Sequence, residues 1–442
     1  MTATFDTVSP EDWKESILKE LKGKPFETVV SRTQDGRELM PFYTAIDRKG
    51  FRGLHGMGPW VCRQDVWGKD AKALNVLILE ALVASVSSIG VNLDEGHKLD
   101  ELFANVQLDI LEVHLKTSRP SGHLEALKSS LASSGRELKA LAGSWDHDPL
   151  TEALIRGAWK QDAVADSSEV FDLMQLFGKD FGMLSIRGDQ FHLAGATSEQ
   201  ELLYSLAAAK AYLDLAKEKG IDLQSLVNQM RFQLAVDTDF LESVSKFMAM
   251  RILWANLAKA YGCDAGAVQL TARSSGWTLA PVDSDTNLLR SSTEALAAIV
   301  GGCDDLVLHP HDGKCDSFSL RMSRNIQHLL KHESYLDKFQ NPVEGAYAFE
   351  SLAASMCEHV WGQLRTMDEQ GGWLKTVEEG HIQVQLYEQA RTKANSLLDG
   401  SRPWLGVNLY ASEEGPALKN IAWTSPESTH LKALHFPIFQ VA

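Results

Sequence analysis

Short apolar segments rich in β-forming residues alternate with longer segments of helical periodicity along most of the chain, at a spacing of roughly 30 to 45 residues. Alternation of strand and helix is typical of parallel strands, and eight such units predict an α/β fold of the closed (β/α)8 barrel type. The segments predicted as strands are 58–63, 88–92, 108–114, 139–143, 183–186, 231–236, 267–271 and 306–309.

Most segments between the predicted strands carry apolar residues at helical spacing. In 200–219 these residues fall on one face, and in 240–260 the helix begins after Asp239, a good N-cap residue, with Glu242 three residues later. Two further segments show the same pattern, 287–300 and 319–330.

After residue 333 helices replace the alternation. The pattern predicts helices over 346–363 and 380–397, interrupted by a Gly-Gly-Trp break at 371–373, and a final short strand or extended segment over 406–410. No low-complexity linker and no change of composition divides this part of the chain. We therefore expect a helical C-terminal extension of the barrel rather than a separate domain.

The N-terminal residues have a different pattern. A short helix over 13–22 ends before a glycine and a proline, an extended segment follows over 27–33, and an Asp-Gly pair at 35–36 marks a turn. The sequence thus predicts an extended arm over 1–45, which we expect to contact another subunit, and a barrel domain with C-terminal helices over 46–442.

The segment 181–206 predicts a strand, a loop and a helix in succession. Gly188 ends the strand, and Ser198 with Glu201 three residues later has the spacing of a capping box. The loop 189–197 then follows the C-terminal end of a strand, where α/β proteins place their chemistry.

The composition limits which binding partners and which cellular compartment we expect. The 442 residues have a net charge of −16, which disfavours nucleic acid or an anionic membrane as the main partner. No segment has the roughly 20 consecutive apolar residues of a membrane span, and the N-terminal sequence lacks the features of a targeting peptide. The five cysteines have no CxxC spacing and are typical of a reducing compartment, so we expect a cytoplasmic location.

Generic catalytic motifs are missing from the sequence, which has no P-loop, HExxH, GxSxG or CxxC. The glycines within 53–58 lack a clear strand and helix around them, so we interpret them as a turn. His309 and His311 follow a strand, but no further ligand stands at a suitable spacing, and a polar loop is the favoured interpretation. We interpret His147 as part of a solvated loop. The sequence therefore predicts no metal site.

Seven stretches, spread over nearly the whole chain, resemble stretches of one protein family in the same order. They are 20–43, 60–75, 194–207, 246–257, 274–302, 324–353 and 371–386, the last of them followed by GVNLY at 406–410. The stretches resemble the methylmalonyl-CoA mutase family, the adenosylcobalamin-dependent acyl-CoA mutases. No single motif is decisive, but the ordered set is specific.

The resemblance implies a (β/α)8 barrel that binds a CoA ester through its centre, followed in the family by a flavodoxin-like cobalamin domain. The family reaction is a radical rearrangement between methylmalonyl-CoA and succinyl-CoA. The cofactor supplies the radical, and the protein supplies binding, orientation and exclusion of water. This division explains why generic catalytic motifs are missing.

Two positions depart from the catalytic members of the family. Those members carry a Tyr directly after an Arg-Gln pair, whereas Arg63 and Gln64 are followed here by Asp65. They also carry Gly-Tyr-His before the AGAT segment, and the His position is Gln190 here. A short carboxylate does not fill the volume of Tyr, and Gln cannot be protonated. The resemblance thus implies that this chain has no catalytic residue.

The same resemblance implies a degenerate substrate pocket. Its predicted members are Arg63, Gln64, Asp65, Gln190, His192 and Ser275. His192, two residues after Gln190, is the residue that could replace the missing family histidine. The glutamate that follows the family histidine is also replaced here, by Leu193.

The family cobalamin domain provides the lower axial ligand from an Asp-x-His-x-x-Gly motif. None of the 14 histidines of this chain has an aspartate two residues before it. We therefore expect no cobalamin domain in this chain and no cofactor bound by it, with adenosylcobalamin held by a partner subunit.

Three functions follow from the resemblance. The favoured one is a non-catalytic small subunit that forms a heterodimer with a large catalytic mutase subunit, with acyl-CoA bound in the complex; the stretch 146–157 resembles small subunits. The alternative is the substrate-binding barrel of a split acyl-CoA mutase of the isobutyryl-CoA type, whose cobalamin domain is a separate chain. That function needs an intact pocket, and Asp65 and Gln190 disfavour it. A binding module outside the mutase system also stays open, and a pull-down distinguishes it.

Overall fold

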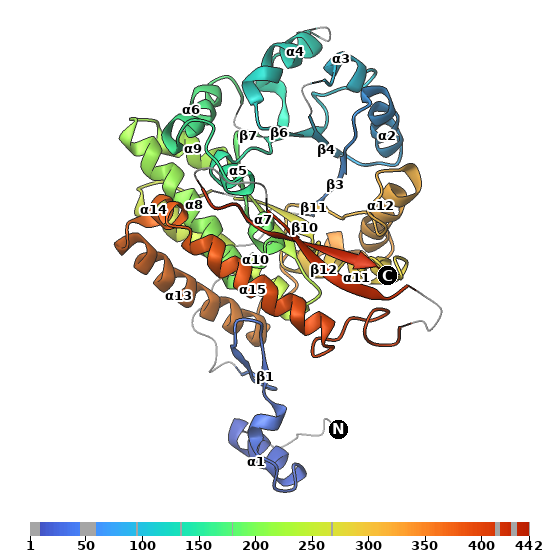
Figure 1. The fold of residues 1–442 in the computed structure, drawn as a ribbon, viewed down its shortest axis with the longest axis vertical. Coiled ribbons are helices and arrows are strands. Elements are labelled where there is room, and N and C mark those ends of the chain that lie inside the picture. The colour runs from blue at the N-terminus through green and yellow to red at the C-terminus, as the bar shows by residue number, and fades with distance from the viewer. Residues whose placement is uncertain are drawn as a thin grey trace, which may run out of the picture.

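A barrel of parallel strands surrounded by helices forms the centre of the molecule (Figure 1). The computed structural model describes residues 9–44, 59–93, 96–132, 135–178, 180–266, 268–411, 416–425 and 431–441. The predicted boundary between arm and barrel and the glycines within 53–58 lie outside the described residues.

Nine parallel strands of the described residues form the central sheet, in the order β7-β6-β5-β4-β3-β11-β10-β9-β8. Their bounds are β3 Val61–Val66, β4 Ser88–Asn92, β5 Glu112–Lys116, β6 Ala142–Trp145, β7 Phe181–Gly182, β8 Leu184–Arg187, β9 Met230–Val236, β10 Gln269–Ser274 and β11 Asp305–Val307. The edge strands β7 and β8 are separated only by Met183, and this one stretch pairs with β6 and with β9. It closes the sheet, so the predicted eight-unit barrel is confirmed.

The predicted strands are present, but several of their ends differ from the predicted ends. The apolar run 108–114 begins before the strand, because Leu108 and Leu111 are buried in the connection that precedes β5. The run 139–143 is shifted as well, because a 3₁₀ helix, η3 Leu138–Ala140, precedes β6. Apolar residues are buried in connections as well as in strands, so periodicity alone misplaces the ends.

Helices cover the outside of the barrel (Figure 1). Their bounds are α1 Pro10–Glu20, α2 Ala71–Val83, α3 Leu99–Leu102, α4 Pro120–Ala132, α5 Pro149–Arg156, α6 Ala163–Met174, α7 Gly188–Leu193, α8 Ser198–Glu218, α9 Leu223–Asn228, α10 Phe240–Ala260, α11 Thr286–Val300, α12 Ser317–His332, α13 Tyr347–Glu369, α14 Gly372–Glu378 and α15 His381–Leu398. Every helix predicted by range is present. Among the described residues, no helix has both the length and the apolar character to cross a membrane.

The segment between β8 and α8 differs from the prediction. Most of the expected loop 189–197 is the short helix α7, and the capping box of α8 begins one residue earlier than expected. Thr197 accepts a hydrogen bond from the Gln200 backbone, and Gln200 accepts one from the Thr197 backbone. Glu201 is therefore free of the cap. Its buried carboxylate bonds instead to Lys246 and to the Ala235 backbone N–H.

The two faces of the barrel strands have opposite character. The face toward the helices is apolar and fully buried, as for Val113, Leu115, Phe232, Leu234 and Leu270. The residues that alternate with them, and that bond to one another across the barrel, are polar or charged. Barrels of this class usually fill their interior with bulky apolar side chains. This barrel therefore has its apolar core outside the strands and a network of polar side chains inside.

The N-terminal arm consists of α1, a 3₁₀ helix η1 Phe26–Val29 and a hairpin of β1 Ser31–Arg32 and β2 Glu38–Leu39. The predicted turn at 35–36 is confirmed, whereas the predicted extended segment 27–33 begins as the 3₁₀ helix. Figure 1 shows α1 projecting away from the barrel, and none of its residues is buried. Arg37 ties the hairpin to the barrel through Glu199 and Ser355.

In the C-terminal extension, α13 packs beside α8 and α10, α14 packs beside α8 and α13, and α15 packs beside α14. The extension ends in an antiparallel hairpin of β12 Leu418–Thr424 and β13 Phe436–Val441. The predicted final strand 406–410 is wrong: this segment is a turn, with Gly406 at φ +75°. The side chain of Asn408 accounts for the turn, because it bonds to the Trp404 N–H and the Leu397 carbonyl group.

Candidate functional site

A cavity of about 410 Å³ lies at the C-terminal ends of the barrel strands. Its floor is formed by the last inward-facing residues of the strands, namely Asp65, Asn92, Lys116, Arg187 and Arg273. Its walls come from α7 and from the segments that follow β10 and β11. The cavity thus lies at the end of the barrel where functional residues were predicted.

Two arginines hold the side chain of Asp65. Its Oδ1 accepts a hydrogen bond from Arg63 Nε at 2.7 Å, and its Oδ2 accepts one from Arg273 Nη2 at 2.8 Å. Burial favours a higher pKa for this carboxyl, but the charges of Arg63 and Arg273 outweigh burial and hold its pKa below the usual range. Asp65 is therefore ionised and fully engaged within the chain.

Arg63 lies beneath the cavity and spans the barrel. Its Nη2 donates to Asp146 Oδ2 at 2.5 Å, which joins β3 to β6 across the two intervening strands. Asp146 Oδ1 also accepts from the hydroxyl groups of Ser144, at 2.7 Å, and Ser185, at 3.3 Å. Below the cavity, the axis of the barrel is thus filled by side chains that bond to one another.

Gly90 on β4 makes room for this arrangement. A Cβ atom at position 90 would lie 1.9 Å from Asp65 Oδ1 and 2.8 Å from Arg63 Nη2. The ion pair therefore depends on a glycine at this position of the neighbouring strand.

A second ion pair forms the rim beside α7. Arg187 donates through Nε and Nη2 to the two carboxylate oxygens of Asp189, each at 3.0 Å. Burial opposes ionisation of Asp189, but the charge of Arg187 prevails and lowers its pKa to about 2. The amide group of Gln190 donates to the same carboxylate at 2.8 Å. Gln190 is thus bonded to its neighbour within α7.

His192 also belongs to α7 and contacts Ser275, which follows β10. Its Nε2 lies 2.7 Å from Ser275 Oγ, and Asp237 Oδ2 lies 3.7 Å from the same nitrogen. Burial, followed by the charge of Lys393, holds the pKa of His192 well below its usual value. His192 is therefore a neutral imidazole in contact with a hydroxyl group.

The six predicted pocket residues separate into three groups. Asp65, Gln190, His192 and Ser275 line the cavity, and Arg63 lies beneath it. Gln64 does not belong to the pocket, because its side chain accepts a hydrogen bond from Arg324 of α12 at 2.9 Å on the outer face of the barrel. The strand alternation explains this correction, since neighbouring residues point to opposite faces.

Sequence reasoning missed three charged groups of the cavity, namely Lys116, Arg187 and Arg273, and it interpreted a further titratable group, His309, as part of a polar loop. The charge of Arg187, desolvation and the charge of Arg273 lower the pKa of Lys116 to about 8. Burial and Arg273 lower the pKa of His309 to about 4. The sequence did contain an indication of such residues, because charged residues two positions apart in a strand lie on the same face.

Three histidines that the sequence placed in polar loops lie in different surroundings. His147 is buried rather than solvated, and its Nδ1 lies 3.0 Å from Glu152. His309 lines the cavity, whereas His311 is buried with Nε2 at 3.9 Å from Asp285.

Comparisons of the sequence with a family model and with individual proteins agree on one family. The sequence model of the family "Methylmalonyl-CoA mutase" matches residues 80–435, which is most of the chain.

Individual relatives agree with that match. The chain is 28% identical over 434 residues to the methylmalonyl-CoA mutase small subunit of Porphyromonas gingivalis, covering 92% of this chain and 70% of the relative. It is 26% identical over 460 residues to the methylmalonyl-CoA mutase of Rhizobium meliloti, covering 91% and 64%. It is 27% identical over 352 residues to the large subunit of Propionibacterium freudenreichii subsp. shermanii, covering 76% and 48%. The chain thus spans about half to two-thirds of these relatives' lengths.

Proposed function

The chain belongs to the methylmalonyl-CoA mutase family, and on that premise we propose that it is the small, non-catalytic subunit of a heterodimeric, adenosylcobalamin-dependent methylmalonyl-CoA mutase. The complex interconverts methylmalonyl-CoA and succinyl-CoA. The observation that carries this proposal is the state of Asp65, whose two carboxylate oxygens are engaged by Arg63 and Arg273.

Asp65 stands where the catalytic members place a tyrosine. Releasing its carboxylate toward a substrate would leave Arg63 and Arg273 without this partner, and breaking a buried ion pair is costly. Gln190, at the position of the family histidine, is likewise bonded to Asp189. The side chains at both catalytic positions thus have structural partners within the chain, which supports a non-catalytic role.

The interior of the barrel supports the same proposal. Family members bind the CoA ester through the centre of the barrel. In this chain the Arg63 to Asp146 ion pair crosses that path, and the hydroxyl groups of Ser144 and Ser185 converge on Asp146. An acyl-CoA would have to separate a buried ion pair before it passed. This observation disfavours the split-mutase alternative, which needs an open path.

The residues of the cavity do not fit adenosylcobalamin. Of the histidines that line it, His192 is bonded to Ser275. No histidine in the sequence stands in the Asp-x-His-x-x-Gly pattern of the family's axial ligand. We therefore assign the cofactor to the partner subunit.

The arm is the proposed contact with the large subunit. Trp13 stacks on Phe42 with ring centroids 4.6 Å apart, while Leu18, Met40 and Phe42 are each about two-fifths exposed. Apolar side chains on a projecting segment are typical of a surface that a partner covers. We expect the arm and an adjoining barrel face to bury more than about 2,000 Å², as obligate interfaces do.

Co-expression with the large mutase subunit from the same source tests the proposal. Size-exclusion chromatography with a mutase assay on each fraction should show co-elution, with activity dependent on the large subunit and none from this chain alone. A chain that stays monomeric beside the large subunit contradicts the proposal. Activity from this chain with a lone cobalamin-binding protein would establish the split-mutase alternative instead.

A further inference from the structure

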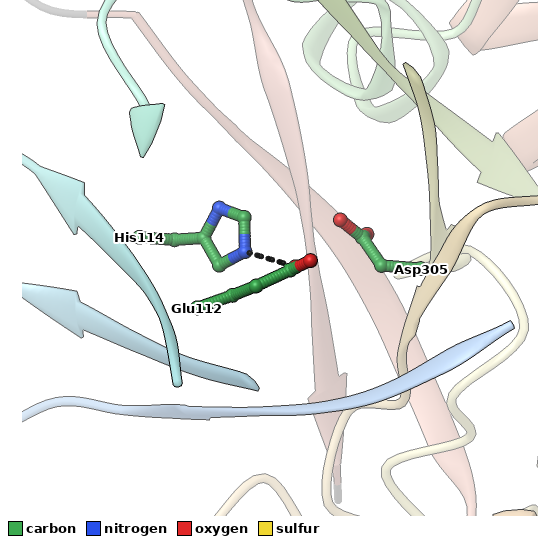
Figure 2. A group of neighbouring side chains, drawn as sticks. All are labelled: Glu112, His114 and Asp305. Atoms are coloured by element: carbon green, nitrogen blue, oxygen red, sulfur yellow. Dashed lines mark ion pairs between the residues drawn. The ribbon is translucent and has the colours of Figure 1, made fainter. Parts of the chain in front are cut away.

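A second group of polar side chains lies at the other end of the barrel, at the N-terminal ends of the strands. Glu112 and His114 come from β5 and Asp305 comes from β11, and one ligand atom of each lies within 4.8 Å of the others (Figure 2). Because β4 and β3 separate β5 from β11 in the sheet, the three side chains face each other across the barrel.

Hydrogen bonds fix the tautomer of His114. Its Nδ1 lies 2.7 Å from Ser144 Oγ, and that hydroxyl group donates its single proton to Asp146 Oδ1 at 2.7 Å. Asp146 is ionised because it pairs with Arg63. Ser144 must then accept from the Nδ1–H of His114. In a neutral imidazole, Nε2 therefore carries the lone pair, and it points into the group.

The facing atoms are electron-rich and buried. His114 is 1% exposed and Asp305 is 3% exposed, and neither His114 Nε2 nor Asp305 Oδ1 has a hydrogen-bond partner. Glu112 Oε2 lies 3.5 Å from His114 Nε2. A lone pair and two carboxylates converge here without a donor between them, an arrangement that is costly unless a cation lies among them.

We propose that Glu112, His114 and Asp305 bind a divalent transition-metal ion, with Zn²⁺ as the representative ion. One imidazole and two carboxylates form a ligand set that Zn²⁺ accepts, and their combined charge of −2 balances the ion. The Ser144 to Asp146 pair behind His114 is the outer support that metal-binding histidines usually have. The ion would link β5 to β11 across the N-terminal mouth.

Access to this site is available from the solvent side. The side chain of Glu112 is 35% exposed at the mouth, so it can rotate toward the ion, and a water molecule can complete the tetrahedron. The two cations near the site both have other partners. Arg231 donates to the Asp180 carbonyl group at 3.1 Å, and Arg63 is paired with Asp65 and Asp146.

The alternative to a metal ion at this site is a proton on His114 Nε2. An imidazolium at His114 would donate from Nε2 to the same carboxylates, and no metal would then be needed. Nitrogen NMR of the imidazole ring distinguishes the two, because a metal replaces the Nε2 proton while the Nδ1–H to Ser144 remains.

The experiment titrates the full chain, after treatment with a chelator, with Zn²⁺ alone and with Mg²⁺ alone. We expect one Zn²⁺ per chain, much weaker binding of Mg²⁺ because of the imidazole ligand, and an anomalous-scattering peak about 2.0–2.2 Å from the three ligand atoms. Ser144→Ala should weaken Zn²⁺ binding about 10- to 100-fold.

His114→Gln and Asp305→Asn should abolish the site. Glu112→Gln keeps the fold intact because its side chain is at the rim, so it tests the site even where a buried variant fails to fold. His381→Gln, on an exposed His–Glu pair, is the control for surface binding and should retain the ion. Absence of a bound Zn²⁺, binding that survives Glu112→Gln and His114→Gln unchanged, or an Nε2–H that persists in excess Zn²⁺ each overturns the proposal.

Discussion

Asp65 Oδ2 and Arg273 Nη2 lie 2.8 Å apart and join the end of β3 to the end of β10, with β11 between the two strands. This pair shares its carboxylate with Arg63, which itself reaches Asp146 on the far side of the barrel. A chain of alternating charges thus runs across the barrel beneath the cavity, and Asp65 has a structural role in it.

Asp65→Ala is expected to destabilise the protein by about 3–5 kcal/mol, because it leaves Arg63 and Arg273 without a shared partner. Urea unfolding followed by tryptophan fluorescence measures this loss. Glu125→Ala is the matched control, because it removes a carboxylate from an exposed pair with Lys128 and should change stability by less than about 0.5 kcal/mol. Equal effects of the two substitutions would contradict the interpretation.

Gly90→Ala tests the space that the ion pair requires. The added Cβ would lie 1.9 Å from Asp65 Oδ1, so the variant should lose about 1–3 kcal/mol of stability. In the Asp65→Ala background the same substitution should cost at least about 0.5 kcal/mol less, because the closest atom is gone.

Gly122→Ala provides the control for Gly90→Ala. Gly122 lies inside α4, and its Cβ would meet nothing closer than 3.8 Å, so alanine there should be neutral or stabilising by up to about 1 kcal/mol. Additive effects in the double variant would show that Gly90 acts independently of Asp65.

The fold was predictable from the sequence for a physical reason. Strands that face helices on one side must be apolar there, so runs such as the one that contains Val113 and Leu115 mark each strand. The final strand was misplaced because GVNLY has the composition of a strand, yet Asn408 bonds to neighbouring backbone groups and forms a turn. Local side-chain bonds of this kind have no hydrophobic signature.

The site was less predictable. The residues at 65 and 190 were found because they depart from a family pattern. Lys116, Arg187 and Arg273 were overlooked because each lies just beyond the end of a predicted strand, whereas β5, β8 and β10 extend far enough to include them. The pairing of Arg273 with Asp65 depends on the assembly of the barrel, which brings strands distant in sequence together, whereas Arg187 and Asp189 are only two residues apart. The sequence shows which residues share a face of one strand and is silent about partners on other strands.

His309 should make stability depend on pH. Burial and Arg273 lower its pKa from 6.5 to about 4, and Asp65, Asp189 and Lys116 also act on it. Between pH 4 and 6.5 the unfolded chain therefore binds more protons at this position than the folded chain, so stability rises with pH across that window and falls on acidification.

Replacing the imidazole tests this dependence. His309→Asn should lower the slope of unfolding free energy against pH between pH 4 and 6.5, removing roughly 1–2 kcal/mol of the change after allowance for solvent screening. Urea unfolding at several pH values measures the slope. His381→Asn, at an exposed position, should leave the slope as it is. An unchanged slope in His309→Asn would show that His309 titrates as in the unfolded chain.

Restoring the two family residues should not restore catalysis. The double variant Asp65→Tyr with Gln190→His, supplied with adenosylcobalamin and methylmalonyl-CoA, is expected to form no succinyl-CoA detectable by mass spectrometry. The ion pair between Arg63 and Asp146 still crosses the barrel in that variant. Circular dichroism and the single variant Gln190→His, which removes only an amide contact, control for loss of fold. Measurable turnover by the folded double variant would show that the interior opens to substrate and that only the two side chains had been lost.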